Sequence, residues 1–236
     1  AELKNLKDYE IKDRFYKDLE FGTAGLRGIL GLGTNRMNEY VIARATKGLA
    51  KTVLAREGSK EKGVVIAHDV RHKSKEFTEI AARVFASMGV KCYIFDGIRP
   101  TPMLSYAVRY LKTQAGIVIT ASHNPKIYNG YKVYWDEGSQ ILEDIANEIQ
   151  NNIKESTYNI EDLPNLEEAK KSGLVEVLKH DLDESYFEET LKRRIHDGDE
   201  LDLGIKIVYT PLNGTGNKPV RHVLQERGFK NVEVVP

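Results

Sequence analysis

The sequence predicts an α/β fold in which helices cover both faces of a β-sheet. Short apolar runs alternate with helical segments from the first glycine-rich stretch to residue 135. The runs are about five residues long, which suits buried strands, whereas the segments between them repeat apolar side chains at helical spacing. Strands that alternate with helices in this way are typical of a sheet between two helical layers.

The first elements follow from local signals. Residues 3–20 are charged and helix-forming, so a helix is predicted there. A second helix is predicted over residues 38–57, because Asn38 is a suitable cap and apolar residues follow on one face. Residues 64–69 form an apolar run that ends in polar residues, which predicts a short buried strand.

The clearest helix of the chain is predicted to begin at Ser74 as its N-cap and to end at Gly89. Thr101 and Pro102 are interpreted as the cap and first residue of the next helix. Strands are predicted over residues 91–95, 116–120 and 131–135.

Beyond residue 140 the pattern is weaker. A helix is predicted over residues 140–156, and the polar stretch 156–172 is interpreted as a loop or a solvated helix. A helix over 182–195, a strand over 205–211, a glycine turn and a helix ending at Gly228 then indicate the opening of a second α/β unit. The sequence begins with Ala and ends within a β-type run, so we expect a piece of a longer protein.

The composition excludes several classes of function. The 35 Lys and Arg residues balance 35 Asp and Glu residues, so no general attraction to nucleic acid or to an anionic membrane is expected. No apolar run approaches the roughly 20 residues of a membrane span. Cys92 is the single cysteine, which excludes an internal disulfide and favours a reducing, cytoplasmic location.

A glycine-rich stretch, residues 21–33, contains five glycines and Arg27. Glycine lets backbone N–H groups approach an anion closely, and an arginine can hold it with two hydrogen bonds. The stretch is therefore a candidate anion-binding loop, and a simple glycine-rich turn with a surface arginine remains an alternative. The order Gly-x-Gly-x-x-Gly after a strand is absent, which excludes a dinucleotide fingerprint.

Polar side chains also follow three predicted strands. They lie at residues 68–71, at Arg99 and at residues 120–124. Ligands of such sheets bind beyond the carboxyl ends of the strands, so these residues are expected to converge on one site. A salt-bridged surface role for Arg71 and Arg99 is an equally open interpretation.

Ser122 follows a strand within this group. A serine needs a base or a local field to act as a nucleophile. The adjacent His123 is badly placed as the base of a hydrolase triad, and the Gly-x-Ser-x-Gly turn of hydrolases is absent. An ordinary turn remains possible, but the nearby cationic candidates favour a phosphoryl carrier. These candidates are Arg27, Arg71, His123 and Lys132.

Three motifs in order resemble the α-D-phosphohexomutase superfamily. Residues 120–125 (Thr-Ala-Ser-His-Asn-Pro) and 128–132 (Tyr-Asn-Gly-Tyr-Lys) resemble its phosphoserine loop. Residues 21–28 (Phe-Gly-Thr-Ala-Gly-Leu-Arg-Gly) resemble its N-terminal loop, and residues 209–216 (Tyr-Thr-Pro-Leu-Asn-Gly-Thr-Gly) resemble the start of its second domain. The form of the first two motifs is most similar to the phosphoglucomutase and phosphopentomutase branch.

The resemblance implies a mutase that exchanges the 1- and 6-phosphates of a hexose, most often glucose. Ser122 would carry the phosphoryl group, Lys132 would act as acid and base, and a bisphosphate such as glucose 1,6-bisphosphate would be the intermediate and activator. Mg²⁺ would contact the Ser122 phosphate. Further implied residues are Arg27 and His123 in catalysis, and Thr23, Gly25, Asn124 and Arg71, with Arg99, in binding the sugar phosphate.

The resemblance also implies three-layer αβα domains, with the first at residues 1–180 and the start of a second at 181–236. The family's aspartate metal loop is missing, so the metal's aspartate ligands are expected beyond residue 236. Residues 196–202 resemble that loop, but their spacing is wrong, and they are interpreted as a solvated acidic turn. Asn213 stands where the family usually has a histidine.

Residues 1–236 alone are therefore expected to be inactive as a mutase. The alternatives are a phosphomannomutase, a phosphopentomutase, or a non-catalytic homologue that binds phosphosugars or has a regulatory role. The expected partners are small sugar phosphates, and the oligomeric state is not predicted.

Overall fold

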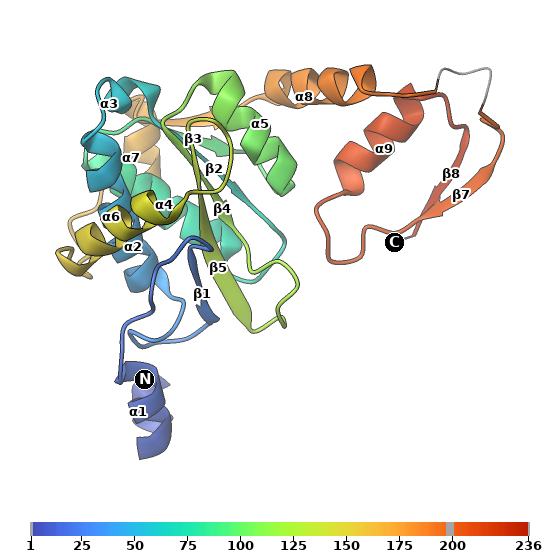
Figure 1. Ribbon diagram of the computed structural model, residues 1–236. Coiled ribbons are helices and arrows are strands. Elements are labelled where there is room, and N and C mark those ends of the chain that lie inside the picture. The colour runs from blue at the N-terminus through green and yellow to red at the C-terminus, as the bar shows by residue number, and fades with distance from the viewer. Residues whose placement is uncertain (1, 197–200, 236) are drawn as a thin grey trace.

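The computed structural model describes residues 2–196 and 201–235 and confirms the predicted α/β class. A six-stranded sheet with the order β1–β5–β4–β2–β3–β6 lies between two layers of helices (Figure 1). The strands are β1 (Leu26–Ile29), β2 (Val64–His68), β3 (Cys92–Phe95), β4 (Ala115–Ile119), β5 (Tyr128–Trp135) and β6 (Val175–Leu178).

The parallel part of the sheet brings the carboxyl ends of four strands to one edge. β4, β2, β3 and β6 are parallel neighbours, so their carboxyl ends share one edge. His68 pairs with Ile119 in the register of β2 and β4, and the Asp69 N–H donates to the Ile119 carbonyl at 3.2 Å. The loops after these two strands therefore begin side by side. β5 is antiparallel to β4, and β1 is antiparallel to β5.

Alternating side chains on the strands supply two hydrophobic cores. Val64 and Ile66 face one core, while Val65 and Ala67 face the other. The first core holds buried residues of α2 (Glu39–Leu54), α4 (Ser74–Ser87), α6 (Glu143–Lys154) and α7 (Leu166–Lys171). The second core holds those of α5 (Thr101–Leu111) and α8 (His180–Lys192). Both strands β2 and β4 are buried along their whole length, as their apolar runs predicted.

The helix predicted over residues 3–20 is wrong in part. Residues 3–20 form only a short 3₁₀-helix, η1 (Glu2–Asn5), and α1 (Asp8–Phe15), which has no buried residue. Beyond the helix, the Leu19 N–H donates to the Thr34 carbonyl and not to a helical partner. The glycine-rich stretch contains the edge strand β1, which pairs with β5.

Both predicted serine and threonine caps are also wrong. Lys73, with φ +68°, is the residue before α4, so Ser74 is the first helical residue and its hydroxyl bonds elsewhere. Pro100 precedes α5, which places Thr101 first and Pro102 second in that helix. α3 (Ser59–Lys62) follows α2 as a separate short turn.

Other boundaries differ by a few residues. β5 begins at Tyr128, three residues before the predicted strand. The stretch after residue 156 contains α7, and the edge strand β6 beyond it was not predicted, because its central residues are exposed and break the apolar pattern.

The last part of the described chain forms a separate lobe, to which α8 leads (Figure 1). It contains the parallel pair β7 (Lys206–Tyr209) and β8 (Asn231–Val234), with α9 (Asn217–Glu226) between them. α9 has no buried residue. The predicted acidic turn at 196–202 falls largely on residues 197–200, which lie outside the described residues. Within the described chain, no helix has the length and apolar character that crossing a membrane requires.

Candidate active site

Ser122 lies at the carboxyl edge of the sheet, in the loop between β4 and β5. Thr120 and Ala121 are buried, whereas Ser122 is exposed. Its φ is +52°, in the left-handed region that a residue with a Cβ seldom adopts. Such a backbone costs about 1–3 kcal/mol and persists only where the surroundings hold it firmly.

One side of Ser122 is held by Thr120 and Asp69. The Ser122 N–H donates to the Thr120 hydroxyl at 2.9 Å, and that hydroxyl donates to Asp69 Oδ2 at 2.5 Å. The other carboxylate oxygen of Asp69 accepts from the Arg71 N–H and from the Ser74 hydroxyl, both at 2.9 Å. Asp69 thus joins the loops after β2 and β4 to the start of α4.

The other side is held by the Arg71 guanidinium. Its Nη2 donates to the carbonyls of Ser122 at 2.7 Å and Asn124 at 2.5 Å. Its Nη1 donates to the carbonyls of Pro125 and Tyr128 at 2.9 and 3.1 Å. Sequence reasoning placed Arg71 among the substrate-binding residues, and the structure shows its donors directed to the backbone of the Ser122 loop.

Lys132 reaches Ser122 from the neighbouring strand. It lies on β5 opposite Val118, and its Nζ donates to Ser122 Oγ at 2.7 Å. Burial lowers the pKa of Lys132, and the positive charge of Arg27 lowers it further. A larger share of neutral amine is then present at a given pH, which suits a group that transfers protons.

Arg27 enters the site from the edge strand β1. It pairs with Gly130 of β5, and its Nη1 donates to Asn124 Oδ1 at 2.9 Å. Glycines let the backbones meet here. A Cβ at Gly130 would lie 2.5 Å from the Thr120 carbonyl oxygen, and one at Gly25, where φ is +75°, would lie 1.9 Å from the Tyr131 carbonyl oxygen. The glycines therefore let the backbone of this stretch pack closely against β5, which brings Arg27 to the serine loop.

A cavity of about 340 Å³ opens beside Ser122. Its lining combines the serine and Val70 with charged and polar side chains from three loops, Asp69, Arg71, His72, Asn124, Lys126 and Asn213. Asn213 comes from the second lobe. The composition suits a phosphorylated, polar ligand more than an apolar one.

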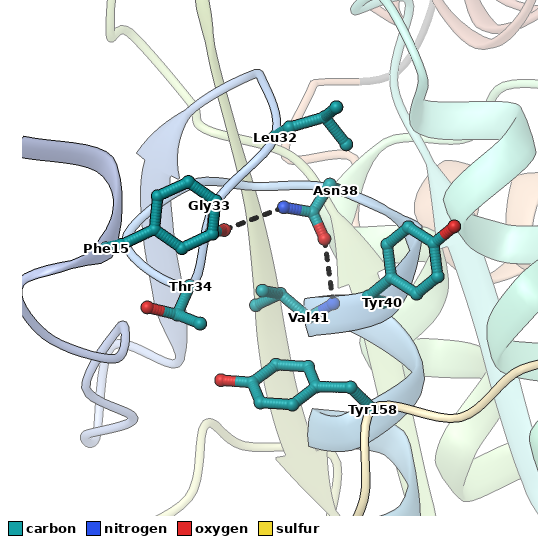
Figure 2. A pocket seen from close by; sticks show the side chains of 8 residues that line it. All are labelled: Phe15, Leu32, Gly33, Thr34, Asn38, Tyr40, Val41 and Tyr158. Carbon is teal, nitrogen blue, oxygen red and sulfur yellow. Dashed lines mark hydrogen bonds between the residues drawn. The ribbon is translucent and has the colours of Figure 1, made fainter. Parts of the chain in front are cut away.

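A second cavity has the opposite character. It measures about 350 Å³ and lies against α1 and the start of α2, with Phe15, Tyr40 and Tyr158 around it (Figure 2). None of its lining residues is charged, so it lacks the cationic side chains that line the cavity beside Ser122.

The remaining predicted residues are not all brought to Ser122. His123 is exposed beside it. Thr23 uses its carbonyl to accept a hydrogen bond from Gln140 at 2.6 Å. Arg99 is buried elsewhere and forms two hydrogen bonds with Asp183 of α8, at 2.9 and 2.6 Å. The structure thus shows the ion pair of the second interpretation of Arg99, but in a buried place and not at the surface.

Sequence reasoning gave no individual role to Asp69, Thr120 or Asn129. Asn129 is fully buried, and its side-chain amide donates to the His72 carbonyl and the Ser74 hydroxyl. The available signal was that Thr120 directly follows the wholly apolar strand β4, while Asp69 follows β2, whose last residue is His68. A buried polar group needs hydrogen-bond partners, so such a residue marks a built network.

A metal site is not complete in this part of the chain. Among the described residues, no group of three or more His, Cys, Asp or Glu side chains could hold a metal ion. Asp69 is the carboxylate beside Ser122, and its oxygens accept hydrogen bonds from Arg71, Ser74 and Thr120.

Known proteins share this sequence and fold. The phosphoglucomutase of Staphylococcus haemolyticus is 40% identical over 222 residues, which cover 94% of this chain and 39% of that protein. The Homo sapiens phosphopentomutase is 37% identical over 238 residues, covering 96% of this chain and 37% of that protein. The chain spans about two fifths of the length of these curated relatives.

Structural comparison agrees. A protein named as a phosphomannomutase from Thermus thermophilus matches with a TM-score of 0.75 and 29% identity, over 93% of this chain and 46% of that one. Residues 18–159 match the family described as phosphoglucomutase/phosphomannomutase, alpha/beta/alpha domain I. The chain therefore belongs to the phosphoglucomutase/phosphomannomutase family.

Proposed function

We propose that this chain carries the phosphoserine site of a phosphosugar mutase that interconverts hexose 1-phosphate and hexose 6-phosphate, with glucose as the preferred sugar. The observation that carries the proposal is the contact of 2.7 Å between Lys132 Nζ and Ser122 Oγ. The contact places a group with a lowered pKa on the exposed hydroxyl of a firmly held loop, beside a polar cavity.

The proposed chemistry is transfer of a phosphoryl group from Ser122 to a sugar hydroxyl. The bond between phosphorus and Ser122 Oγ breaks, and a bond between phosphorus and the sugar oxygen forms. Neutral Lys132 accepts the proton of the sugar hydroxyl and delivers it to Ser122 Oγ. The bisphosphate formed, such as glucose 1,6-bisphosphate, then returns its other phosphoryl group to Ser122 by the reverse steps.

The neighbouring side chains have distinct proposed roles. Arg27 stabilises negative charge on the transferring group, since its guanidinium lies next to Asn124 on the serine loop. His123 and Asn124 orient the sugar phosphate from the exposed loop, and Thr23 and Gly25 contribute through the backbone of the glycine-rich stretch. Arg71 acts on the loop itself through its bonds to four carbonyls.

The metal and the domain organisation are further proposals. Mg²⁺ would contact the phosphate on Ser122, and its carboxylate ligands would come from outside the described residues, which hold no suitable group. Residues 1–180 would form the first domain, because β6 completes the sheet before α8 leads to the second lobe, the start of a second domain at 181–236. Residues 1–236 alone would then not complete the mutase cycle. The single cysteine favours a cytoplasmic location.

Intact-mass measurement on the complete gene product tests the proposal. Incubation with glucose 1,6-bisphosphate should add one phosphate, located at Ser122 by peptide analysis, and glucose 1-phosphate should remove it. Ser122→Ala should show neither change. A wild-type protein that binds the sugar phosphates but never gains the phosphate would contradict the proposal and favour a non-catalytic phosphosugar-binding protein.

The sugar is tested separately. Relatives named phosphoglucomutase and phosphopentomutase match this chain at similar identity. Dephosphorylation of phospho-Ser122 by glucose, mannose and ribose phosphates, compared under equal conditions, should be fastest with glucose phosphate. A faster reaction with ribose or mannose phosphate would replace glucose by that sugar.

A further inference from the structure

We propose that Asp69 and Thr120 are positioning residues that hold Ser122 in its reactive conformation. The inference rests on the proposed function, and it assigns a role in the rate of phosphoryl transfer to two residues for which the sequence predicts no individual role.

The argument starts from the two peptide groups that flank Ser122. The φ of a residue is fixed when its N–H and its C=O are both held. The Ser122 N–H is held by the Thr120 hydroxyl, and the Ser122 carbonyl is held by Arg71 Nη2. These two contacts maintain the φ of +52°, which the chain would otherwise relax.

Asp69 anchors both contacts. Its Oδ2 accepts from the Thr120 hydroxyl, and the same oxygen lies 3.5 Å from Arg71 Nε. Its Oδ1 accepts from the Arg71 N–H, which fixes the start of that side chain. The Asp69 carboxylate therefore binds both Thr120 and Arg71, the two residues that hold Ser122.

Asp69 is itself fixed to the scaffold. Its N–H bonds to the Ile119 carbonyl at the end of β4, and Ser74 donates to it from the first residue of α4. Its position is thus set by the fully buried strands β2 and β4 and by a core helix. Firm positioning of this kind is what a transfer reaction needs, because small displacements of a reacting atom have large effects on rate.

Thr120 acts on the site only through its neighbours Ser122 and Asp69. It is 6% exposed, it does not line the cavity, and its hydroxyl is engaged as donor to Asp69 and acceptor from Ser122. Loss of that hydroxyl should therefore lower the rate of transfer and leave the binding of sugar phosphate unchanged.

The chain offers a matched control at the other end of the same strand. Thr113 precedes β4, is fully buried, and its hydroxyl has no hydrogen-bond partner among the described residues. Thr113→Val removes the same group as Thr120→Val from a comparable buried place without touching the site. Thr120→Ser is the conservative variant, since it keeps the hydroxyl.

The test measures single-turnover transfer between Ser122 and glucose 1,6-bisphosphate in the complete gene product. Thr120→Val should lower the rate by about 10- to 100-fold, with the concentration for half-maximal rate within about twofold of wild type. Thr120→Ser should restore most of the rate, and Thr113→Val should match wild type. If Thr120→Val does not fold, Asp69→Asn is measured in its place, and the same loss of rate is expected. The asparagine amide presents an N–H donor where the carboxylate oxygen accepted the Thr120 hydroxyl.

The possible failures are distinguishable. A wild-type protein without transfer to Ser122 overturns the proposed function and this inference together. A wild-type protein that transfers, with a folded Thr120→Val variant of equal rate, overturns the positioning role alone. Equal losses in Thr120→Val and Thr113→Val, or no rescue by serine, also overturn it, because both indicate a general packing effect.

Discussion

Two parallel strand pairs, β2 with β4 and β7 with β8, differ sharply in how far they are buried. Val118 on β4 is 1% exposed, whereas Val208 on β7 is 70% exposed. β2 and β4 lie between two helical layers, but neither β7 nor β8 has a buried residue. Parallel strands are usually buried on both faces, so the second pair lacks the burial that stabilises the first.

This difference explains where a strained serine can be kept. Ser122 follows β4, and the carboxylate that anchors its loop follows β2, so both come from the most buried strands of the molecule. The second lobe contributes Asn213 to the same cavity from the end of an exposed strand. The reacting serine is thus held by the buried first sheet, whereas the second lobe contacts the cavity from a region with little burial.

Amide hydrogen exchange should show the largest effect. In the chain of residues 1–236, amides of β2 and β4 should open only with global unfolding, while those of β7 and β8 open locally. We expect protection factors at least about 1,000-fold higher in the first pair, because global unfolding costs several kcal/mol more than local opening. The measurement is exchange followed by mass spectrometry or NMR. Similar protection in both pairs would mean that the two regions unfold as one cooperative unit, which would contradict the proposed difference in stability.

Alanine substitutions should give the next largest difference. Ile117 lies between Ile66 and Val133 in the first sheet and is fully buried. Ile117→Ala should lower the free energy of unfolding by about 2–5 kcal/mol, through lost burial and a residual cavity. Val208→Ala is the matched change on the exposed pair and should stay within about 0.5 kcal/mol.

Urea unfolding followed by circular dichroism measures both changes. A loss in Val208→Ala as large as that in Ile117→Ala would show that the second pair is packed in solution, contrary to its exposure.

The same contrast limits what could be predicted from sequence. The helices α2, α4, α5 and α6 and the buried strands of the first region were predictable, because their apolar spacing is a local property of the chain. β6 was missed because its two central residues are exposed and leave only a weak signal. The Ser74 cap was wrong because Lys73 takes a left-handed backbone, which no local pattern indicated.

The site was predictable in its reacting groups and not in its support. Ser122, Lys132 and Arg27 stand in recognisable motifs, and the structure brings them together. The role of Arg71 depends on carbonyls between 51 and 57 residues away along the chain. Contacts of this kind depend on the register of β2, β4 and β5, which a single sequence does not specify.

The smallest expected effect is a change in the pKa of Lys132. It tests whether the first region alone controls the electrostatics of the site. Both causes of its lowered pKa, burial and Arg27, lie in the first region. Arg27→Gln removes the positive charge, so the pKa should rise toward the ordinary value of about 10.4. Asn213→Ala, a change in the second lobe, removes no charge and should leave it unaltered. Titration of the labelled lysine side chain by NMR measures both variants directly.

The sign of the linked stability follows from the same shift. The unfolded chain binds a proton at Lys132 more tightly than the folded chain, so this residue favours folding increasingly as pH rises from the lowered pKa toward the ordinary value. Arg27→Gln should narrow that pH window from its lower end. A Lys132 pKa that moves in Asn213→Ala and stays fixed in Arg27→Gln would place the electrostatic control in the second lobe, and the division of labour between the two regions would then be reversed.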